Sequence, residues 1–234
     1  MTADSSNVRS SHQSADAMQA QDSGHQAAGR EARFWDRIAE RYARKPVPDE
    51  AVYRRKLAIT QRYLRPDMAL LEFGCGTGTT AIEHAPHVNN ILAIDISAAM
   101  LDIARLRAAD AGVDNVHFRQ QTLAQLTLAN GSLDAVLGLS ILHLLDDRGA
   151  ALAKVHRLLK PGGLFISSTP CLADSLWFLK PLLAVGSRLG LVPQVQFFSR
   201  DNFQRELAGA GFDIEYQWQP GSRQGVFIVA RKAR

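Results

Sequence analysis

The 234-residue sequence has only two cysteines, few aromatic residues (7%) and a net charge of only +4. Cys75 and Cys171 lie far apart in apolar surroundings, which excludes a disulfide framework and favours a reducing compartment. No Cys or His pair stands at ligand spacing near another such pair, so we expect no metal site. The sequence also lacks an apolar run of about 18 residues and the basic-then-apolar layout of a signal peptide. We therefore expect a cytoplasmic protein.

The composition indicates one globular domain behind a tail. Hydrophobic residues make up 46% of the chain and charged residues 21%, which is ordinary for a folded domain. Residues 1–29 differ, because Ser, Ala, Gln, Asp and His dominate them and almost no large apolar side chain offsets the entropy of ordering. We predict a disordered N-terminal tail (1–29) and a single domain (30–234).

Residues 30–66 predict two amphipathic cap helices at the start of this domain. Phe34 and Tyr42 share an apolar helical face, and Asp49 can cap a second helix that ends before Pro66. This stretch contains 11 Lys and Arg against 5 Asp and Glu. Its basic character fits a solvated helix face, an anionic substrate, an acidic membrane surface or RNA.

After Pro66, short apolar runs alternate with helical segments, which is typical of βα units and a parallel sheet. The predicted strands are Ala69–Phe73, Asn90–Asp95, Val116–Gln120, Leu133–Leu139, Gly163–Ser168, Phe212–Gln219 and Gly225–Arg231. The predicted helices between them are Thr79–Ala85, Ala98–Ala111, Arg148–Leu159 and Arg200–Ala210. Because a short segment joins the last two strands, we expect them to pair antiparallel. The fold class is therefore α/β: a doubly wound, mostly parallel seven-stranded sheet with helices on both faces and an antiparallel C-terminal strand.

A glycine-rich turn links the first predicted strand to the helix that follows it. Gly74, Gly76 and Gly78 fill this turn, where a ligand can touch the backbone and meet a helix N-terminus. Asp95 ends the second predicted strand, where a carboxylate can accept hydrogen bonds from both ribose hydroxyls. Thr79 stands where a dinucleotide fingerprint requires another glycine. These features predict a nucleoside-bearing cofactor other than a dinucleotide.

The acidic residue Glu72 and the following Gly74-Cys75-Gly76-Thr77-Gly78 resemble the first motif of the class I S-adenosylmethionine-dependent methyltransferases. The resemblance covers about residues 34–231. It also includes the helix 34–42, the strand 93–97, the strand 133–136 and the segment 157–163. It implies a Rossmann-like seven-stranded domain, S-adenosyl-L-methionine as the cofactor and methyl transfer as the reaction.

The resemblance also implies roles for individual residues. The glycine loop forms the wall against the methionine portion, and Glu72 buttresses the loop or the cofactor ammonium. Asp95 holds the ribose, and Thr122 stands where the family commonly has an Asp that reads the adenine edge. Tyr42 lies on a helix that folds over the cofactor in this family, although simple core packing explains it equally well. The complete predicted cofactor set is Tyr42, Glu72, Gly74, Cys75, Gly76, Thr77, Gly78, Asp95, Ile96, Met100, Thr122, Leu123 and Leu139.

The methyl acceptor is less well defined by the sequence. His143, after the fourth predicted strand, is a candidate general base or acceptor-orienting residue, with a structural role as the alternative. Residues 172–198 are rich in Leu, Phe and Trp, and we interpret them as an apolar lid over the acceptor pocket or as helices packed on the sheet edge.

We therefore expect a small, hydrophobic acceptor. The alternatives are a lipid or quinone acceptor at a membrane surface, which requires peripheral membrane contact, and binding of S-adenosylmethionine without catalysis. We do not expect a nucleic acid partner, and the oligomeric state stays open.

Overall fold

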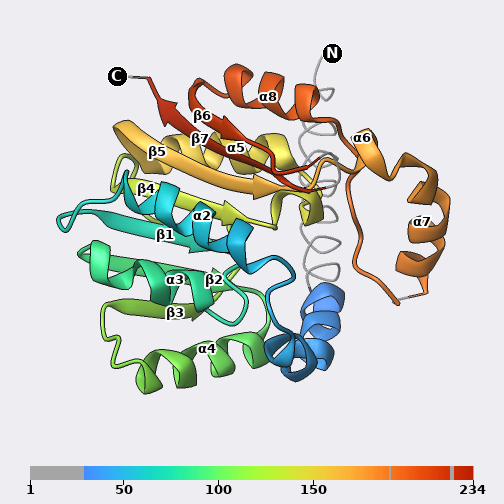
Figure 1. Cartoon of the computed structure of the whole chain (residues 1–234), viewed down its shortest axis with the longest axis horizontal. Helices are drawn as coiled ribbons and strands as arrows, with labels where there is room; N and C mark the ends of the chain where they lie inside the picture. Colours follow the sequence, from blue (N-terminus) through green and yellow to red (C-terminus); the bar gives the residue numbers. More distant parts are fainter. Residues whose placement is uncertain (1–28, 190, 222–223, 234) are drawn as a thin grey trace, which may run out of the picture.

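The computed structural model describes residues 29–189, 191–221 and 224–233, so the predicted tail up to residue 28 lies outside the described residues. Seven strands form a single sheet. They are β1 (Ala69–Phe73), β2 (Asn90–Asp95), β3 (Val116–Gln120), β4 (Leu133–Leu139), β5 (Leu159–Thr169), β6 (Phe212–Trp218) and β7 (Val226–Lys232). Their order in the sheet is β3-β2-β1-β4-β5-β7-β6 (Figure 1).

The strand directions confirm the predicted fold class. β1 pairs in parallel with β2 and β4, while β7 runs antiparallel to both β5 and β6. The bounds of β1 to β4 are those predicted from the sequence, because Gly, Pro and Asp residues mark the ends of these short apolar runs. β6 ends one residue earlier than predicted, and β7 is shifted by one residue at both ends.

The start of β5 was predicted wrongly. It begins at Leu159, directly after a helix, rather than at Gly163. Leu133 of β4 pairs with Leu159, but Ala135 pairs with Leu164, so the intervening Lys160-to-Gly163 segment forms a bulge inside the strand. The positive φ of Gly162 (75°) allows this bend, and Arg231 Nη1 donates to its carbonyl oxygen. Residues that resemble a helix-ending loop therefore belong to a strand.

Helices cover both faces of the sheet (Figure 1). One face carries α2 (Glu50–Gln61), α3 (Thr79–His84) and α4 (Ala98–Asp110), and the other carries α5 (Arg148–Leu158) and α8 (Arg200–Gly209). Single turns of 3-10 helix lie at η1 (Ala85–His87), η2 (Leu142–Leu144) and η3 (Trp177–Leu179). The side chains of Asp49, Ser97, Asp147 and Ser199 cap the helices that follow them.

The core consists of two apolar layers separated by the sheet. Leu71 and Phe73 of β1 join α5 and α8 in one layer, whereas Leu70 of the same strand joins α2, α3 and α4 in the other. This alternation follows from the two-residue repeat of a strand. Because both faces are covered, functional groups are left to the sheet edges and the ends of the strands.

A further helix spans residues 29–44 and lies at the carboxyl ends of the parallel strands (Figure 1). We call it the roof helix. Gly29, which falls within the predicted tail, already belongs to this helix.

Residues 172–198, which we call the arm, project from the body of the protein on the same side (Figure 1). The arm contains α6 (Leu172–Ser175), η3 and α7 (Lys180–Arg188). Its two ends are joined to each other, because Ala173 N donates to Phe198 O (3.2 Å), and the arm is tied to the body, because Gln196 N donates to His143 O (2.7 Å). Within the described ranges, no helix has the length and apolar character needed to span a membrane.

Candidate active site

A pocket lies at the carboxyl ends of β1, β2 and β4, beneath the roof helix. Asp95 and the glycine loop contribute to its wall. Nine of the predicted cofactor residues line it, namely Tyr42, Gly74, Gly76, Asp95, Ile96, Met100, Thr122, Leu123 and Leu139. The parallel strands all end at this edge, so they bring together residues that are far apart in the sequence.

The glycine loop is attached to β2 by backbone hydrogen bonds. The N–H groups of Gly74 (2.8 Å) and Cys75 (3.1 Å) both donate to Ile94 O. Gly76 N donates to Asp95 Oδ2 (2.8 Å), and Ser97 N donates to Asp95 Oδ1 (2.9 Å). Burial raises the pKa of Asp95, but these N–H donors act in the opposite direction. The Asp95 carboxylate is therefore fixed in orientation at the pocket wall.

Two glycines of the loop are required for different reasons. At Gly76 (φ 53°) no atom lies within 4 Å of the position of a Cβ, so a ligand can approach the backbone. At Gly78 (φ 73°) a Cβ would lie 2.8 Å from the Cβ of Ala104 and 2.9 Å from the ring of Phe118. Gly76 thus leaves room for a ligand, whereas Gly78 allows α4 and β3 to pack against the loop.

Five predicted site residues are not part of the pocket lining. Cys75 is buried in the apolar layer below α2, and Thr77 Oγ1 accepts a hydrogen bond from Arg107 Nη1 (2.7 Å). The others are Glu72, Gly78 and His143. The roles proposed for these five residues stay predictions.

Glu72 lies behind the loop and is 3% exposed. Its Oε2 atom has no hydrogen-bond partner among the described residues. Burial, with a smaller contribution from the negative charge of Asp95, raises the pKa of Glu72 to about 8. A carboxyl group with this pKa is mostly protonated at neutral pH. A cation placed nearby would stabilise its ionised form.

His143 lies on η2, between the pocket residues Ile141 and Leu144. Burial lowers the pKa of His143 to about 4, so the imidazole is neutral at physiological pH. Its Nδ1 atom is buried and has no hydrogen-bond partner among the described residues. The ring therefore has the protonation state of a base, but it lies behind the pocket wall.

The roof helix supplies pocket residues that sequence reasoning missed. Glu31 and Trp35 line the pocket together with Tyr42, and the rings of Trp35 and Tyr42 meet edge to face at 6.4 Å. Burial, and secondarily the charge of Asp146, raises the pKa of Glu31 to about 7. The amphipathic pattern predicts this helix but contains no signal for where it docks.

Two further residues hold the roof helix in place. Asp36 Oδ1 accepts hydrogen bonds from Ser97 Oγ (2.6 Å) and Ala99 N (3.1 Å) at the start of α4. Arg107 Nη2 donates to Ala43 O (2.8 Å), while its Nη1 contacts the glycine loop at Thr77. Arg107 therefore joins α4, the loop and the roof helix.

The region after β3 offers two candidate acceptors for a ligand amino group. The hydroxyl of Thr122 is already engaged, since it donates to Gln125 Oε1 (3.0 Å) and accepts from Gln125 N (3.1 Å). The adjacent Gln121 Oε1 also belongs to a pocket residue, is buried, and has no partner among the described residues. Sequence comparison with the family directed attention to Thr122, whereas the unpaired oxygen belongs to its neighbour.

A partly buried lysine lies beside the pocket at β5. Lys56 Nζ of α2 donates to Ser168 Oγ (2.9 Å), and burial lowers the pKa of Lys56. Ser168 pairs with the pocket residue Leu139, and its carbonyl oxygen accepts from Ser140 N (2.7 Å). Lys56 therefore places a positive charge one strand away from the pocket, and no sequence motif pointed to it.

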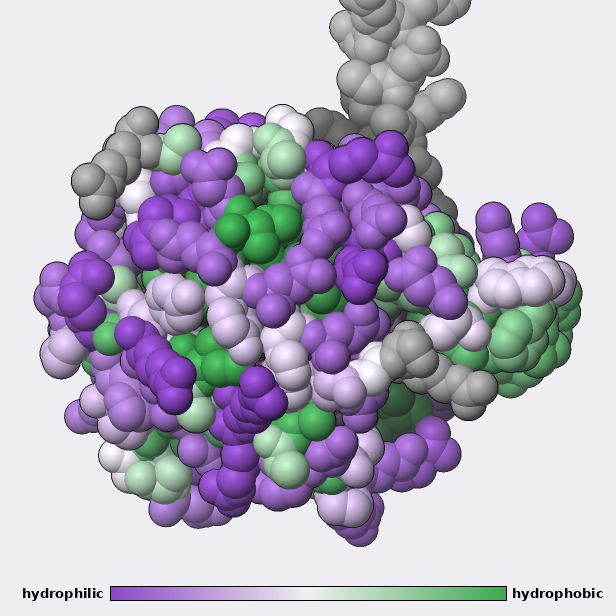
Figure 2. Space-filling view, turned by 45° about the horizontal axis from the view of Figure 1, so that its top comes forward, coloured by the Kyte–Doolittle hydropathy of each residue, from purple (hydrophilic) through white to green (hydrophobic). Residues whose placement is uncertain are grey.

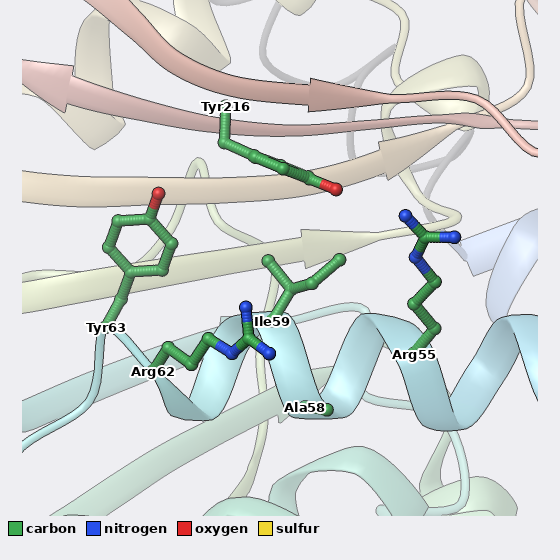
Figure 3. Close-up of a pocket in the computed structure, with 6 residues that line it drawn as sticks. All are labelled: Arg55, Ala58, Ile59, Arg62, Tyr63 and Tyr216. Atoms are coloured by element: carbon green, nitrogen blue, oxygen red, sulfur yellow. The ribbon is translucent and has the colours of Figure 1, made fainter.

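A second cavity, between α2 and β6, has a different character (Figure 3). Arg55 and Arg62 line it with Tyr63 and Tyr216, and Figure 3 shows the Tyr216 hydroxyl pointing toward the Arg55 guanidinium. Arg55 also lies over the ring of Trp218 at 4.2 Å. This cavity, at about 470 Å³, is larger than the pocket, at about 180 Å³. The larger volume does not make the second cavity the candidate active site. The predicted cofactor residues line the smaller pocket beneath the roof helix, and none of them lines the second cavity.

Comparison with known proteins identifies similar methyltransferases. Residues 70–163 match the family of methyltransferase domains. The ubiquinone/menaquinone biosynthesis C-methyltransferase of Coxiella burnetii is 34% identical over 131 residues, which are 54% of this chain and 49% of that protein. The uncharacterized methyltransferase YcgJ of Bacillus subtilis is 31% identical over 110 residues, covering 47% of this chain and 44% of that protein. The chain thus spans about half the length of these curated relatives.

Solved structures extend the likeness to the whole sheet. The crystal structure of YcgJ superposes with a TM-score of 0.62 at 18% identity and covers 77% of this chain and 99% of that chain. The geranyl diphosphate C-methyltransferase of Streptomyces coelicolor, in complex with Mg²⁺, geranyl diphosphate and S-adenosyl-L-homocysteine, superposes with a TM-score of 0.66 at 16% identity. It covers 88% of this chain and 98% of that chain. At this identity the likeness establishes the fold.

Proposed function

We propose, on the premise that residues 70–163 match the family of methyltransferase domains, that the protein transfers a methyl group from S-adenosylmethionine to a small, hydrophobic acceptor. The observation that carries the proposal is the fixed Asp95 carboxylate beside the open backbone at Gly76. A carboxylate at the end of the second strand suits the two hydroxyls of a ribose. A glycine loop without phosphate ligands suits the amino acid end of S-adenosylmethionine.

The remaining pocket residues fit the other parts of this cofactor. Ile96 and Met100 supply apolar walls for the adenine, and Gln121 Oε1 with the backbone of Leu123 supplies polar groups at its edge. Glu72 stands behind the loop, where the positive charge of the cofactor would stabilise its carboxylate form. Tyr42 and Trp35 of the roof helix close the pocket from above.

Calorimetric titration with S-adenosylhomocysteine tests this assignment directly. We expect micromolar binding to the wild-type protein and about 10- to 100-fold weaker binding to Asp95→Ala, because hydrogen bonds to a buried ligand are lost. Asp102→Ala is the matched control, since Asp102 lies on the exposed side of α4 with 72% of its side chain accessible and pairs with Arg105. Binding of NADH in place of the sulfur compound, or equal binding by both variants, would contradict the proposal.

The chemistry needs positioning more than acid or base catalysis. S-adenosylmethionine, when bound, supplies an already activated methyl group, so the protein must hold the acceptor atom in line with it. We assign this positioning to the edge formed by Leu139, Ser140 and Ile141. His143 is neutral and lies directly behind this edge, where a small displacement of η2 would let it take a proton from a hydroxyl or amine acceptor.

A second candidate function is the methylation of a lipid or quinone at a membrane surface. Two observations favour it: the apolar arm beside the pocket, and the relative that acts in ubiquinone/menaquinone biosynthesis. Turnover of a prenylated quinone precursor in vesicles, and not of a water-soluble aromatic acceptor, would select this candidate. Intact cofactor binding without turnover on either acceptor would instead indicate a protein that binds the cofactor without catalysis.

A further inference from the structure

The arm exposes large apolar side chains to solvent. Trp177 is 70% exposed, and Leu182, Leu189 and Leu191 are 67–68% exposed. With Phe178 and Val185, the arm holds six of the ten exposed large hydrophobic residues found in the described ranges. The arm forms a hydrophobic projection at the right of Figure 2. An apolar surface of this kind, gathered on one projecting segment, marks an interaction site.

The exposed apolar residues of η3 and α7 follow a helical repeat. Phe178 of η3, Leu182 and Val185 of α7, and the C-cap residue Leu189 are spaced by four, three and four residues, so they form one stripe along this segment. Lys180 is exposed and lies on the opposite side of the helix from this stripe. The helix therefore has an apolar face directed to solvent and a basic residue, Lys180, on its opposite face.

The arm carries a small net positive charge, and its one acid, Asp174, lies at its base, where it accepts a hydrogen bond from Arg200 N (2.8 Å). Between Ser175 and Ser199 the chain contains Lys180 and Arg188 but no Asp or Glu. The roof helix, on the same side of the molecule, contains five Arg residues against three Asp and Glu residues. A protein partner of ordinary polarity would not require this combination, whereas an anionic membrane surface complements both its apolar stripe and its positive charge.

The position of the arm relates it to the pocket. Both lie at the carboxyl ends of the parallel strands (Figure 1), and the return segment of the arm is bonded to η2 through Gln196 N and His143 O. A surface that contacts the apolar stripe would therefore lie next to the wall at which we place the acceptor.

We propose that the arm is a membrane-docking element, in which the stripe Phe178-Leu182-Val185-Leu189 and Trp177 enter the interfacial region of an anionic lipid bilayer. Lys180 and Arg188 extend to the lipid headgroups. In this arrangement the bilayer delivers an apolar acceptor to the pocket edge. Delivery of an acceptor rests on the proposed methyl transfer, whereas docking of the arm on the bilayer does not.

Vesicle co-sedimentation of the full chain tests the docking. We expect binding to mixed phosphatidylcholine–phosphatidylglycerol vesicles and much weaker binding to phosphatidylcholine alone. The double variant Leu182→Ser/Leu189→Ser should bind at least ~10-fold more weakly, because two large apolar side chains no longer enter the lipid. Leu106→Ser is the matched control: Leu106 of α4 is also 67% exposed but lies outside the arm. Lys180→Glu/Arg188→Glu should remove the preference for anionic vesicles.

Tryptophan fluorescence provides a second readout. The chain has three Trp residues, and only Trp177 lies in the arm. Anionic vesicles should shift the emission to shorter wavelength, and Trp177→Phe should abolish the shift while the signals of Trp35 and Trp218 remain.

Three results would overturn the inference. The first is that the wild type binds neither kind of vesicle. The second is that Leu106→Ser loses as much vesicle binding as Leu182→Ser/Leu189→Ser. The third is that light scattering shows a dimer that depends on the arm, while vesicles are not bound. The last result would identify a second copy of this chain as the partner. Titration with S-adenosylhomocysteine in the same samples separates the two proposals, because loss of cofactor binding contradicts the methyltransferase function and leaves the vesicle result unaffected.

Discussion

The pocket edge and the arm lie next to each other, yet they are built in opposite ways. At the pocket edge, Phe73, Ile94 and Met100 are no more than 2% exposed, and Asp95 is held by backbone donors. In the arm, residues of similar hydrophobicity, such as Trp177 and Leu182, face solvent. The first region can form its site within a single chain. The arm has apolar surface that its own chain does not cover, so its role depends on a binding partner that covers this surface.

This difference predicts where substitutions affect folding. Changes near the pocket act on a dry, closely packed interior and should alter the free energy of unfolding by several kcal/mol. Changes in the arm should leave the free energy of unfolding almost unaltered.

The largest effect is expected at Glu72. A carboxyl group whose pKa is raised from 4.5 to about 8 on folding contributes its full stability below pH 4.5, and that contribution is lost as the pH rises toward 8. The side chain of Glu72→Gln cannot ionise. The free energy of unfolding of this variant, relative to that of the wild type, should therefore increase by about 4 kcal/mol as the pH rises across this range. Urea unfolding of both proteins at intervals across the range measures the difference. A difference that does not change with pH would mean that Glu72 ionises freely and that the interior behind the loop is not dry.

Gly78→Ala should be next in size. The positive φ and the 2.8 Å approach to Ala104 together predict a loss of about 3 kcal/mol. Gly112→Ala has a similar φ (65°) with no atom within 4 Å, so it should lose only about 1 kcal/mol. Thermal or chemical unfolding gives both values. Equal losses would show that backbone conformation alone, and not packing of α4, requires glycine in the loop.

The smallest effect is expected in the arm. Leu182→Ser should change the free energy of unfolding by less than about 0.5 kcal/mol, because the side chain is already 67% exposed. The same unfolding measurement serves as the check. A loss above about 1 kcal/mol would mean that the stripe is packed in solution, and the contrast between the two regions would no longer hold.

Much of the region from β1 to β4, which contains the glycine loop and Asp95, could be predicted from the sequence. The bounds of β1 to β4, the glycine loop and the position of Asp95 all depend on local signals, such as turn residues and the end of an apolar run. The same signals failed at β5, because the bulge at Lys160-to-Gly163 is set by pairing with β4 and by Arg231 from β7. Register of this kind depends on residues far away in the chain.

Tertiary placement accounts for the other differences. An amphipathic pattern predicts the roof helix, but only docking on α4 shows that Glu31 and Trp35 enter the pocket. The apolar composition of the arm predicts a lid over the acceptor pocket or helices packed on the sheet edge, but large side chains such as Trp177, Leu182 and Leu189 are exposed. Gln121 was missed because an amide next to a motif position carries no pattern of its own.

The attachment of the roof helix has a consequence for the timing of catalysis. Three hydrogen bonds, two at Asp36 and one from Arg107 to Ala43, join it to α4 across the mouth of the pocket. If S-adenosylmethionine binds beneath Trp35 and Tyr42 as proposed, separation of this helix from α4 would widen its exit. The residence time of the spent cofactor would then depend on contacts within the protein that the ligand never touches.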